Sequence, residues 1–264
     1  MRAGQTGPPG ADRNGEITLD TIRDLKLYQP KSGYRFSVDA LLLSAFVAVP
    51  VAKRIADLGA GSGIIGMLLA RKYSGSRVAL LELQDTFVRL AEANVKQNHL
   101  EGRVSVVACD IRAVGKNGLT DPLLPKGSYD IVVSNPPFRR PKTGLVSPEE
   151  ERAIARHEIR LRLPELIGAA QYLLRSKGKL FLIYHPERLA ELILSLKEGN
   201  MEIKRLRFVH SSSGSEAKMV LVEALKDGRT GVKVERPLCL YDGEGGYSQE
   251  IRALCHSTPG ESSL

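Results

Sequence analysis

The stretch with the most obvious chemistry is Asn135-Pro136-Pro137-Phe138, which directly follows an apolar run at 129–134. Proline lacks a backbone N–H and its ring locks φ, so two prolines in succession make a rigid turn. The residue before a proline is also held in extended backbone. The turn therefore fixes an amide side chain, which can hydrogen-bond a substrate, and an aromatic ring, which can stack on a base.

A second candidate site is the glycine loop "DLGAGSG", which contains Asp57, Gly59, Gly61 and Gly63 and precedes a helical pattern. Glycines in such a turn let backbone N–H groups approach an anion at a helix N-terminus. A dinucleotide-binding fingerprint needs its third glycine three positions after the second, where this chain has Ile64. The loop therefore disfavours a NAD site, although taken alone it leaves that site and a plain tight turn open.

Acidic residues follow the next two apolar runs. Glu82 ends the run 77–82, where a carboxylate can accept hydrogen bonds from both hydroxyls of a ribose. NAD enzymes also place an acid there, so Glu82 indicates nucleoside binding without saying which nucleoside. Asp110 follows the run 103–108 and, by itself, is as suitable for capping a helix as for binding a ligand.

The elements that must position these residues alternate between strand and helix. The apolar runs are mostly continuous, as in parallel strands that are covered on both faces. They lie at 54–59, 77–82, 103–108, 129–134 and 179–184, with helical patterns between them, the longest at 147–176. Two further runs, 201–210 and 217–226, are separated by a short turn and predict an antiparallel pair. The pattern predicts an α/β fold with an open, doubly wound, mostly parallel sheet and an antiparallel hairpin at its edge.

Seven segments together resemble one bacterial family, the tRNA adenine-N6 methyltransferases that modify valine tRNA beside the anticodon. The segments are "YQPKSGYRFSVDALLLSAF", "DLGAGSGIIGMLLA", "LELQ", "SNPPF", "ARHE", "FLIYHPERLAELI" and "LRFVH". The likeness extends over residues 17–248. It implies the class I methyltransferase fold, which is Rossmann-like with a seven-stranded sheet.

The resemblance also implies S-adenosyl-L-methionine (AdoMet) as the methyl donor. The glycine loop would bend around its methionine part, and Asp110 would accept a hydrogen bond from its adenine amino group. The implied cofactor-binding residues are Phe36, Ser37, Asp39, Asp57, Gly59, Gly61, Gly63, Glu82, Asp110, Ile111 and Asn135. From the residues alone, the segment that contains Ser37 and Asp39 is equally well explained as a capped helix.

The turn at 135–138 resembles the motif of methyltransferases that act on an amino nitrogen conjugated to a ring or a carbonyl. Such a nitrogen is a poor nucleophile because its lone pair is delocalised. The Asn135 oxygen and the Pro136 carbonyl would accept its two N–H bonds and turn the lone pair toward the methyl group. Pro137 would stiffen the turn and Phe138 would stack on a flipped base. The methyl donor carries the difficult chemistry, so no metal and no strong base is expected.

Several amino substrates fit this motif. It occurs in enzymes that act on adenine N6, on guanine N2 in RNA and on glutamine in proteins. The glutamine enzymes carry a helical N-terminal domain that this chain lacks, and the guanine enzymes are often duplicated, whereas no repeat is found here. Valine-tRNA enzymes tend to have tyrosine where this chain has Phe138. We therefore expect tRNA adenine N6 as the substrate, with guanine N2, protein glutamine, a NAD-dependent oxidoreductase and a non-catalytic RNA-binding module as alternatives.

The charge of the chain suits an RNA partner. The formal net charge is +8, and a basic protein can bind a polyanion. Six basic residues are candidate RNA contacts, three directly behind the motif and three at four-residue spacing in the following helical pattern. They are Arg139, Arg140, Lys142, Arg152, Arg156 and Arg160. The helical stripe could track phosphates or could be a solvated face paired with Glu149 and Glu158. On the same helix, His157 and Glu158 are expected to pack or pair rather than catalyse.

Composition sets the remaining expectations. The apolar fraction of 42% and charged fraction of 26% are those of an ordinary globular protein. The three cysteines have no metal-ligand spacing, and neither a signal peptide nor a membrane span is found, so a reduced, cytoplasmic protein is expected. We predict tails at 1–16 and 249–264 around a single methyltransferase domain at 17–248.

Overall fold

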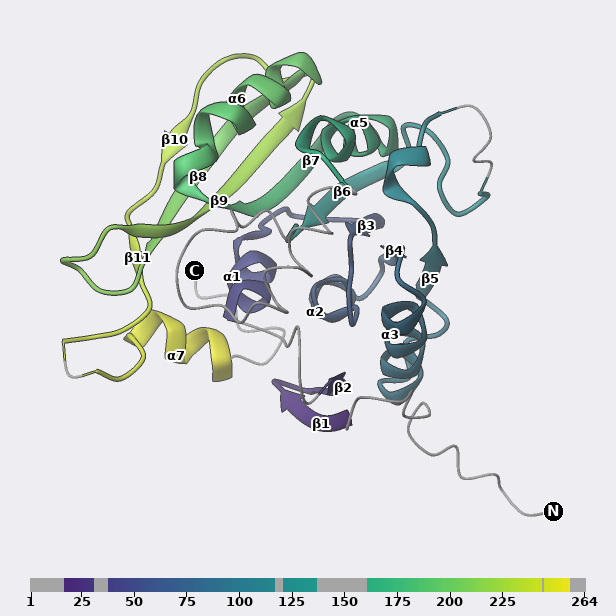
Figure 1. Ribbon diagram of the computed structural model, residues 1–264, viewed down its shortest axis with the longest axis horizontal. Coiled ribbons are helices and arrows are strands. Elements are labelled where there is room, and N and C mark those ends of the chain that lie inside the picture. The colour runs from purple at the N-terminus through teal and green to yellow at the C-terminus, as the bar shows by residue number, and fades with distance from the viewer. Residues whose placement is uncertain (1–16, 31–37, 117–120, 137–160, 244, 257–264) are drawn as a thin grey trace.

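A twisted, mostly parallel sheet forms the centre of the molecule (Figure 1). The computed structural model describes residues 17–30, 38–116, 121–136, 161–243 and 245–256. The parallel strands are β3 (Arg54–Leu58), β4 (Arg77–Glu82), β5 (Val104–Ala108), β6 (Tyr129–Ser134) and β7 (Leu174–Tyr184). All five predicted strands are therefore confirmed.

The antiparallel pair predicted at the edge of the sheet is also confirmed. It consists of β8 (Met201–His210) and β9 (Ala217–Lys226), and the order across the sheet is β10-β8-β9-β7-β6-β3-β4-β5. Because β9 is antiparallel to both β7 and β8, β8 runs in the same direction as the parallel strands. Two short strands, β10 (Lys233–Val234) and β11 (Leu238–Cys239), pair with the outer edge of β8.

Helices cover both faces of the sheet, which explains why the strand sequences are apolar throughout. One face carries α1 (Val38–Phe46), α2 (Ile64–Lys72), α3 (Asp85–Gln97) and α7 (Gln249–His256). The other carries α5 (Leu163–Leu173) and α6 (Leu189–Glu198). Alternate residues of β6 serve the two cores: Ile131 and Val133 pack on the first face, and Val132 packs on the second.

A hairpin of β1 (Ile17–Ile22) and β2 (Leu25–Pro30) forms a separate two-stranded sheet against α3. Leu25 and Leu27 are fully buried in the first core. This hairpin precedes the first helix, α1. None of the helices that the structure describes is long and apolar enough to cross a membrane.

Two predicted boundaries are wrong. Residues 249–256 were assigned to a C-terminal tail but form α7, since Ile251 is fully buried beside α1 and Glu250 forms an ion pair with Arg207 of β8. The long helix predicted at 147–176 gives way to strand at Leu174, which pairs with Tyr129. Its first part, 147–160, and the predicted terminal segments 1–16 and 257–264 lie outside the described residues.

Candidate active site at the carboxyl ends of β3, β4 and β6

β3 is the switch point of the sheet: β4 and β5 are added on one side of it, and β6 and β7 on the other. In open α/β sheets, ligands bind in the crevice outside the carboxyl ends of strands at such a switch point. At this switch point lie the glycine loop after β3, Glu82 at the end of β4 and Asn135 after β6. The structure therefore brings together the three strand ends on which the candidate site was predicted.

The glycine loop has a left-handed backbone at each of its three glycines. The φ angles of Gly59, Gly61 and Gly63 are 74°, 55° and 83°. A Cβ on Gly63 would lie 2.7 Å from the Leu80 side chain, so packing requires glycine there. A Cβ on Gly59 or Gly61 would meet no other described residue within 4 Å. The backbone at these two positions thus faces open space, which suits a ligand that lies directly against the loop.

Glu82 holds this loop in place. Its Oε2 accepts a hydrogen bond of 2.9 Å from the backbone N–H of Gly61, and its Oε1 accepts bonds of 2.9 Å from the N–H groups of Leu83 and Gln84. A carboxylate has about four lone-pair sites, so these three bonds leave roughly one for a ligand. Glu82 is 6% exposed. Most of the acceptor capacity of Glu82 therefore serves the loop, and its contact with a ribose stays a prediction.

Asp57 was predicted to contact the cofactor, but the structure buries it beneath the glycine loop with no accessible surface. Its Oδ2 accepts a 2.9 Å hydrogen bond from the backbone N–H of Gly66 in the first turns of α2. Its Oδ1 is buried without a hydrogen-bond partner among the described residues. Asp57 therefore anchors the helix that follows the loop, and the prediction of direct contact is corrected to a positioning role.

Burial raises the pKa of Asp57 to about 7 from a usual 3.8, and the charge of Glu82 adds to this, while the Gly66 bond opposes it. Between these two pKa values the folded chain keeps a proton that the unfolded chain releases. The free energy of unfolding contributed by this group is therefore largest at low pH and falls as the pH rises through about 7.

We expect Asp57→Asn to remove that pH dependence. Urea unfolding of both proteins between about pH 5 and about pH 8 measures it, because a protonatable group shows as a slope in the free energy of unfolding against pH. The wild-type curve should fall toward about pH 8 relative to the curve of the variant. Two parallel curves would contradict the raised pKa.

Asp110 caps a short helical turn, η1 (Ile111–Ala113), at the end of β5. It accepts a 2.9 Å bond from the backbone N–H of Arg112, and its Oδ2 accepts a 2.6 Å bond from the guanidinium of the same residue. This side-chain bond lowers the pKa of Asp110. The helix-cap role considered from the sequence is confirmed. Ile111 is only 6% exposed, so little of its side chain could lie against a ligand.

Asn135 and Pro136 are half-buried directly after β6. The preceding residue, Ser134, is fully buried, and its hydroxyl donates a 2.6 Å hydrogen bond to the Leu58 carbonyl. This bond joins the residue before Asn135 to the residue before Gly59, and sequence reasoning missed it. Its only sequence signal is a small polar residue at the end of an otherwise apolar strand.

Asn94 of α3 is a second residue that sequence reasoning missed. It is fully buried and exchanges hydrogen bonds with the backbone of Tyr28 in β2, accepting at 2.7 Å and donating at 3.1 Å. It also donates a 3.0 Å bond to the carbonyl of Ser62 in the glycine loop. One turn later, Asn98 holds Lys26 of β2 in the same way, at 2.9 Å and 2.8 Å, but does not reach the loop.

The other predicted site residues fall into two groups. Asp39 is half-buried in the first turn of α1. The rest lie outside the described residues: Phe36, Ser37, Pro137, Phe138, Arg139, Arg140, Lys142, Arg152, Arg156 and Arg160.

Comparison with known proteins agrees with this geometry. The methyltransferase small domain family matches residues 37–205. A "tRNA1(Val) (adenine(37)-N6)-methyltransferase" from Porphyromonas gingivalis ATCC 33277 is 31% identical over 72% of this chain and 73% of its own length. One of the same name from Shewanella sp. W3-18-1 is 30% identical over 90% of this chain and 96% of its own length.

Solved structures show the same fold. A predicted O-methyltransferase from Agrobacterium tumefaciens is 26% identical, with a TM-score of 0.62 over 81% of this chain and 94% of its own. M. jannaschii TYW2, solved in complex with AdoMet, is 13% identical, with a TM-score of 0.54 over 81% of this chain and 87% of its own, a likeness of fold alone. The chain belongs to the methyltransferase small domain family and to the family of tRNA1(Val) (adenine(37)-N6)-methyltransferases.

Proposed function

We propose that this protein transfers a methyl group from AdoMet to the N6 amino group of an adenine in tRNA, at the position beside the anticodon that its relatives are named for. The observation that carries the proposal is the placement of Asn135 and Pro136 next to the glycine loop, with the Ser134–Leu58 hydrogen bond joining the two strand ends. The names of the relatives support the choice of tRNA adenine.

The residues around the loop fit AdoMet. The open backbone at Gly59 and Gly61 would lie against the methionine part, and the remaining acceptor site of Glu82 would take a ribose hydroxyl. Arg112 donates to both oxygens of Asp110, so an adenine amino group would share these acceptors with Arg112. When bound, the cofactor supplies an electrophilic methyl group on a sulfonium sulfur.

The chain's own contribution is to orient the nucleophile. The Asn135 side-chain oxygen and the Pro136 carbonyl would accept the two N–H bonds of the adenine amino group, which favours a pyramidal nitrogen with its lone pair directed at the methyl group. These acceptors are fixed before the substrate binds because proline locks the turn. Pro137 would add stiffness, and Phe138 would provide the face on which the flipped base stacks.

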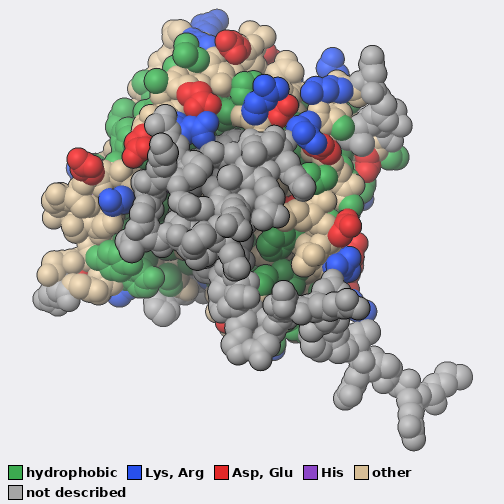
Figure 2. Space-filling view, viewed as in Figure 1, with side chains coloured by type: hydrophobic (Ala, Val, Ile, Leu, Met, Phe, Trp, Pro, Cys, Tyr) green, Lys and Arg blue, Asp and Glu red, His purple; other side chains and the backbone are tan. Residues whose placement is uncertain are grey.

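Charge supports an RNA substrate, since six basic residues follow the motif in sequence. RNA contact by Arg139, Arg140, Lys142, Arg152, Arg156 and Arg160 stays a prediction. On the described surface, Figure 2 shows Lys and Arg side chains interspersed with Asp and Glu in the upper part of the view. A tRNA substrate would also place the enzyme in the cytoplasm.

The test is incubation of the protein with isotopically labelled AdoMet and unmodified tRNA, followed by nucleoside analysis by mass spectrometry. We expect labelled N6-methyladenosine. Labelled N2-methylguanosine would replace the proposed base, and label on a protein glutamine would replace RNA altogether. If the protein binds AdoMet but no labelled nucleoside is found in the tRNA, the proposal is contradicted.

The two asparagines of α3 provide a test of how the cofactor loop is held. Asn94→Ala and Asn98→Ala each remove both bonds to the β2 backbone, but only Asn94→Ala removes the bond to Ser62. We expect both to lower the free energy of unfolding by about 1–3 kcal/mol. Only Asn94→Ala should also weaken AdoMet binding, by about fivefold, the worth of one hydrogen bond. Calorimetric titration decides, and equal losses of affinity in both variants would contradict the role of Asn94.

A further inference from the structure

The segment after β9 returns along the outer edge of β8 and ends beside the active-site edge of the sheet. β10 pairs in parallel with Arg205 and Leu206, and β11 pairs in parallel with Val209 and His210, the last residues of β8. Because β8 runs in the direction of β6, the turn after β11 emerges at the same edge as Asn135. From β6 to β11 there are four strand spacings of ~4.8 Å, or roughly 20 Å.

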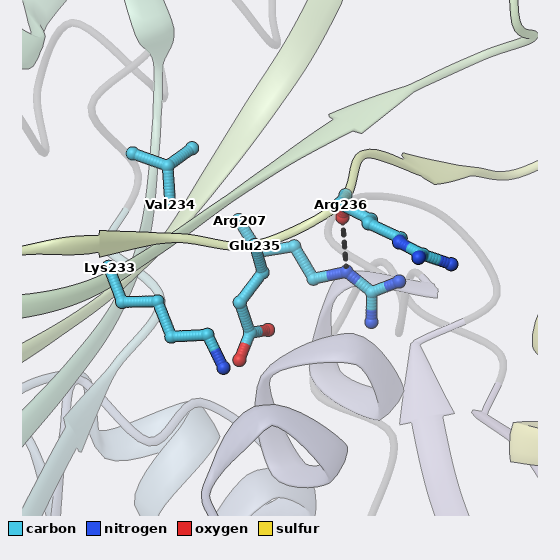
Figure 3. A pocket seen from close by; sticks show the side chains of 5 residues that line it. All are labelled: Arg207, Lys233, Val234, Glu235 and Arg236. Atoms are coloured by element: carbon cyan, nitrogen blue, oxygen red, sulfur yellow. Dashed lines mark hydrogen bonds between the residues drawn. The ribbon is translucent and has the colours of Figure 1, made fainter.

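This segment carries two cations, Lys233 and Arg236, that pair with no acid among the described residues. Arg207, Lys233, Val234, Glu235 and Arg236 line a shallow depression of about 430 Å³. Figure 3 shows Lys233 and Arg236 extending on either side of Arg207. Both are exposed, and neither side chain has an ion pair within the described part of the chain.

The neighbouring acids are each neutralised. Glu235 pairs with Arg205 at 3.2 Å, and Glu250 pairs with both terminal nitrogens of Arg207 at 2.6 and 2.8 Å. Asp242 pairs with Arg252 at 3.1 Å. The described surface between β10 and α7 therefore presents net positive charge, and its positive charges that are available to a partner are those of Lys233 and Arg236.

The turn after β11 displays two exposed aromatic rings. Tyr241 and Tyr247 are stacked, with ring centroids 5.5 Å apart and planes at 9°, and they are 43% and 44% exposed. The pair is held by a backbone bridge between the same two residues. A parallel pair that is already ordered offers a rigid face on which an unpaired base can stack at little entropic cost.

We propose that Tyr241, Tyr247, Lys233 and Arg236 form a second contact surface for the RNA substrate. The tyrosine pair stacks on a base, and the two cations contact phosphates of the same RNA farther back along β8. The proposal rests on the proposed function, because the RNA whose adenine lies at Asn135 must extend along the same edge of the sheet. A structural staple would explain the tyrosine stack but not the two exposed cations farther back along β8, which form no ion pair among the described residues.

Two double variants test this surface. Tyr241→Leu with Tyr247→Leu keeps apolar bulk but removes the rings, whereas Tyr241→Phe with Tyr247→Phe keeps them. We expect the leucine pair to raise the KM for full-length tRNA by about tenfold, as loss of base stacking does. The kcat and the AdoMet Kd should stay at wild-type values, and the phenylalanine pair should behave as wild type. Equal KM values for the leucine and phenylalanine pairs would overturn the stacking role.

The cations are tested against a matched pair at the opposite edge. One double variant carries Lys233→Gln and Arg236→Gln. The control double variant carries Lys53→Gln and Arg77→Gln, which remove two exposed cations at the amino ends of β3 and β4. Only the Lys233→Gln, Arg236→Gln variant should raise the KM for tRNA. In the same variant, the slope of log affinity against log salt concentration should become shallower, by the amount expected for the loss of about one to two phosphate contacts. Equal effects would overturn the phosphate contacts.

Failure of this surface can be distinguished from failure of the proposed function. A wild-type protein that methylates no tRNA would overturn both, whereas tRNA methylation with unchanged KM values in the variants would overturn the surface alone.

Discussion

Asn135→Ala is expected to lower the single-turnover rate of tRNA methylation by about 100- to 1,000-fold, the usual effect of removing one preorganised polar group from a transition state. The alanine cannot accept the N–H bond that turns the amino lone pair toward the methyl group. The AdoMet Kd should change by less than about twofold, because the glycine loop and Glu82 are untouched and hold the cofactor without the contact that the resemblance implies for Asn135. Rapid-mix assays at saturating tRNA and AdoMet measure the rate.

Ser134→Ala is the matched control for this variant. It removes the hydroxyl that bonds to the Leu58 carbonyl at the same strand end but leaves both amino-group acceptors in place. Because its effect is on the alignment of the two strand ends, we expect a loss of about tenfold or less, with a lowered free energy of unfolding. A Ser134→Ala rate as low as that of Asn135→Ala would show that alignment, and not the Asn135 acceptor, limits the reaction.

The fold was predictable from the sequence because each central strand packs against a hydrophobic core on both faces of the sheet, and its sequence is therefore apolar at successive positions. Ile131, Val132 and Val133 are all fully buried, on alternate faces of the sheet, which leaves no polar position between Asp130 and Ser134. Parallel strands also place their carboxyl ends at one edge, so the loop, Glu82 and Asn135 could be brought together before their distances were known.

The parts that escaped prediction depend on contacts between distant segments. Asn94 pairs with Tyr28, 66 residues away, and nothing in the local pattern distinguishes it from a surface asparagine. Helix α7 is short and exists because Ile251 and Glu250 find partners across the fold. Asp57 has the spacing of a cofactor ligand, but spacing does not tell whether a carboxylate points above or beneath a loop.

Alanine substitutions at two glycines with similar left-handed backbone can distinguish the cost of backbone strain from the loss of cofactor binding. Gly61 and Gly127 have φ angles of 55° and 62°, and a Cβ on either would meet no other described residue within 4 Å. Substitution by alanine should therefore cost about 1–2 kcal/mol of unfolding free energy at both positions, the cost of a left-handed residue with a side chain. Gly127 donates its N–H to Tyr172 before β6 begins, at the opposite edge of the sheet from the proposed cofactor.

Gly61→Ala should lower the affinity for AdoMet by about tenfold or more, since its methyl group projects into the space that the cofactor would fill and overpacking of that size costs about 1–3 kcal/mol. Gly127→Ala should bind AdoMet as the wild type does. Thermal unfolding with and without AdoMet distinguishes the two effects, because a ligand that binds only the folded state raises the Tm. Both variants should start from a similarly lowered Tm, and AdoMet should restore it in Gly127→Ala alone. If AdoMet stabilises Gly61→Ala as strongly as Gly127→Ala, the cofactor does not lie against this part of the loop.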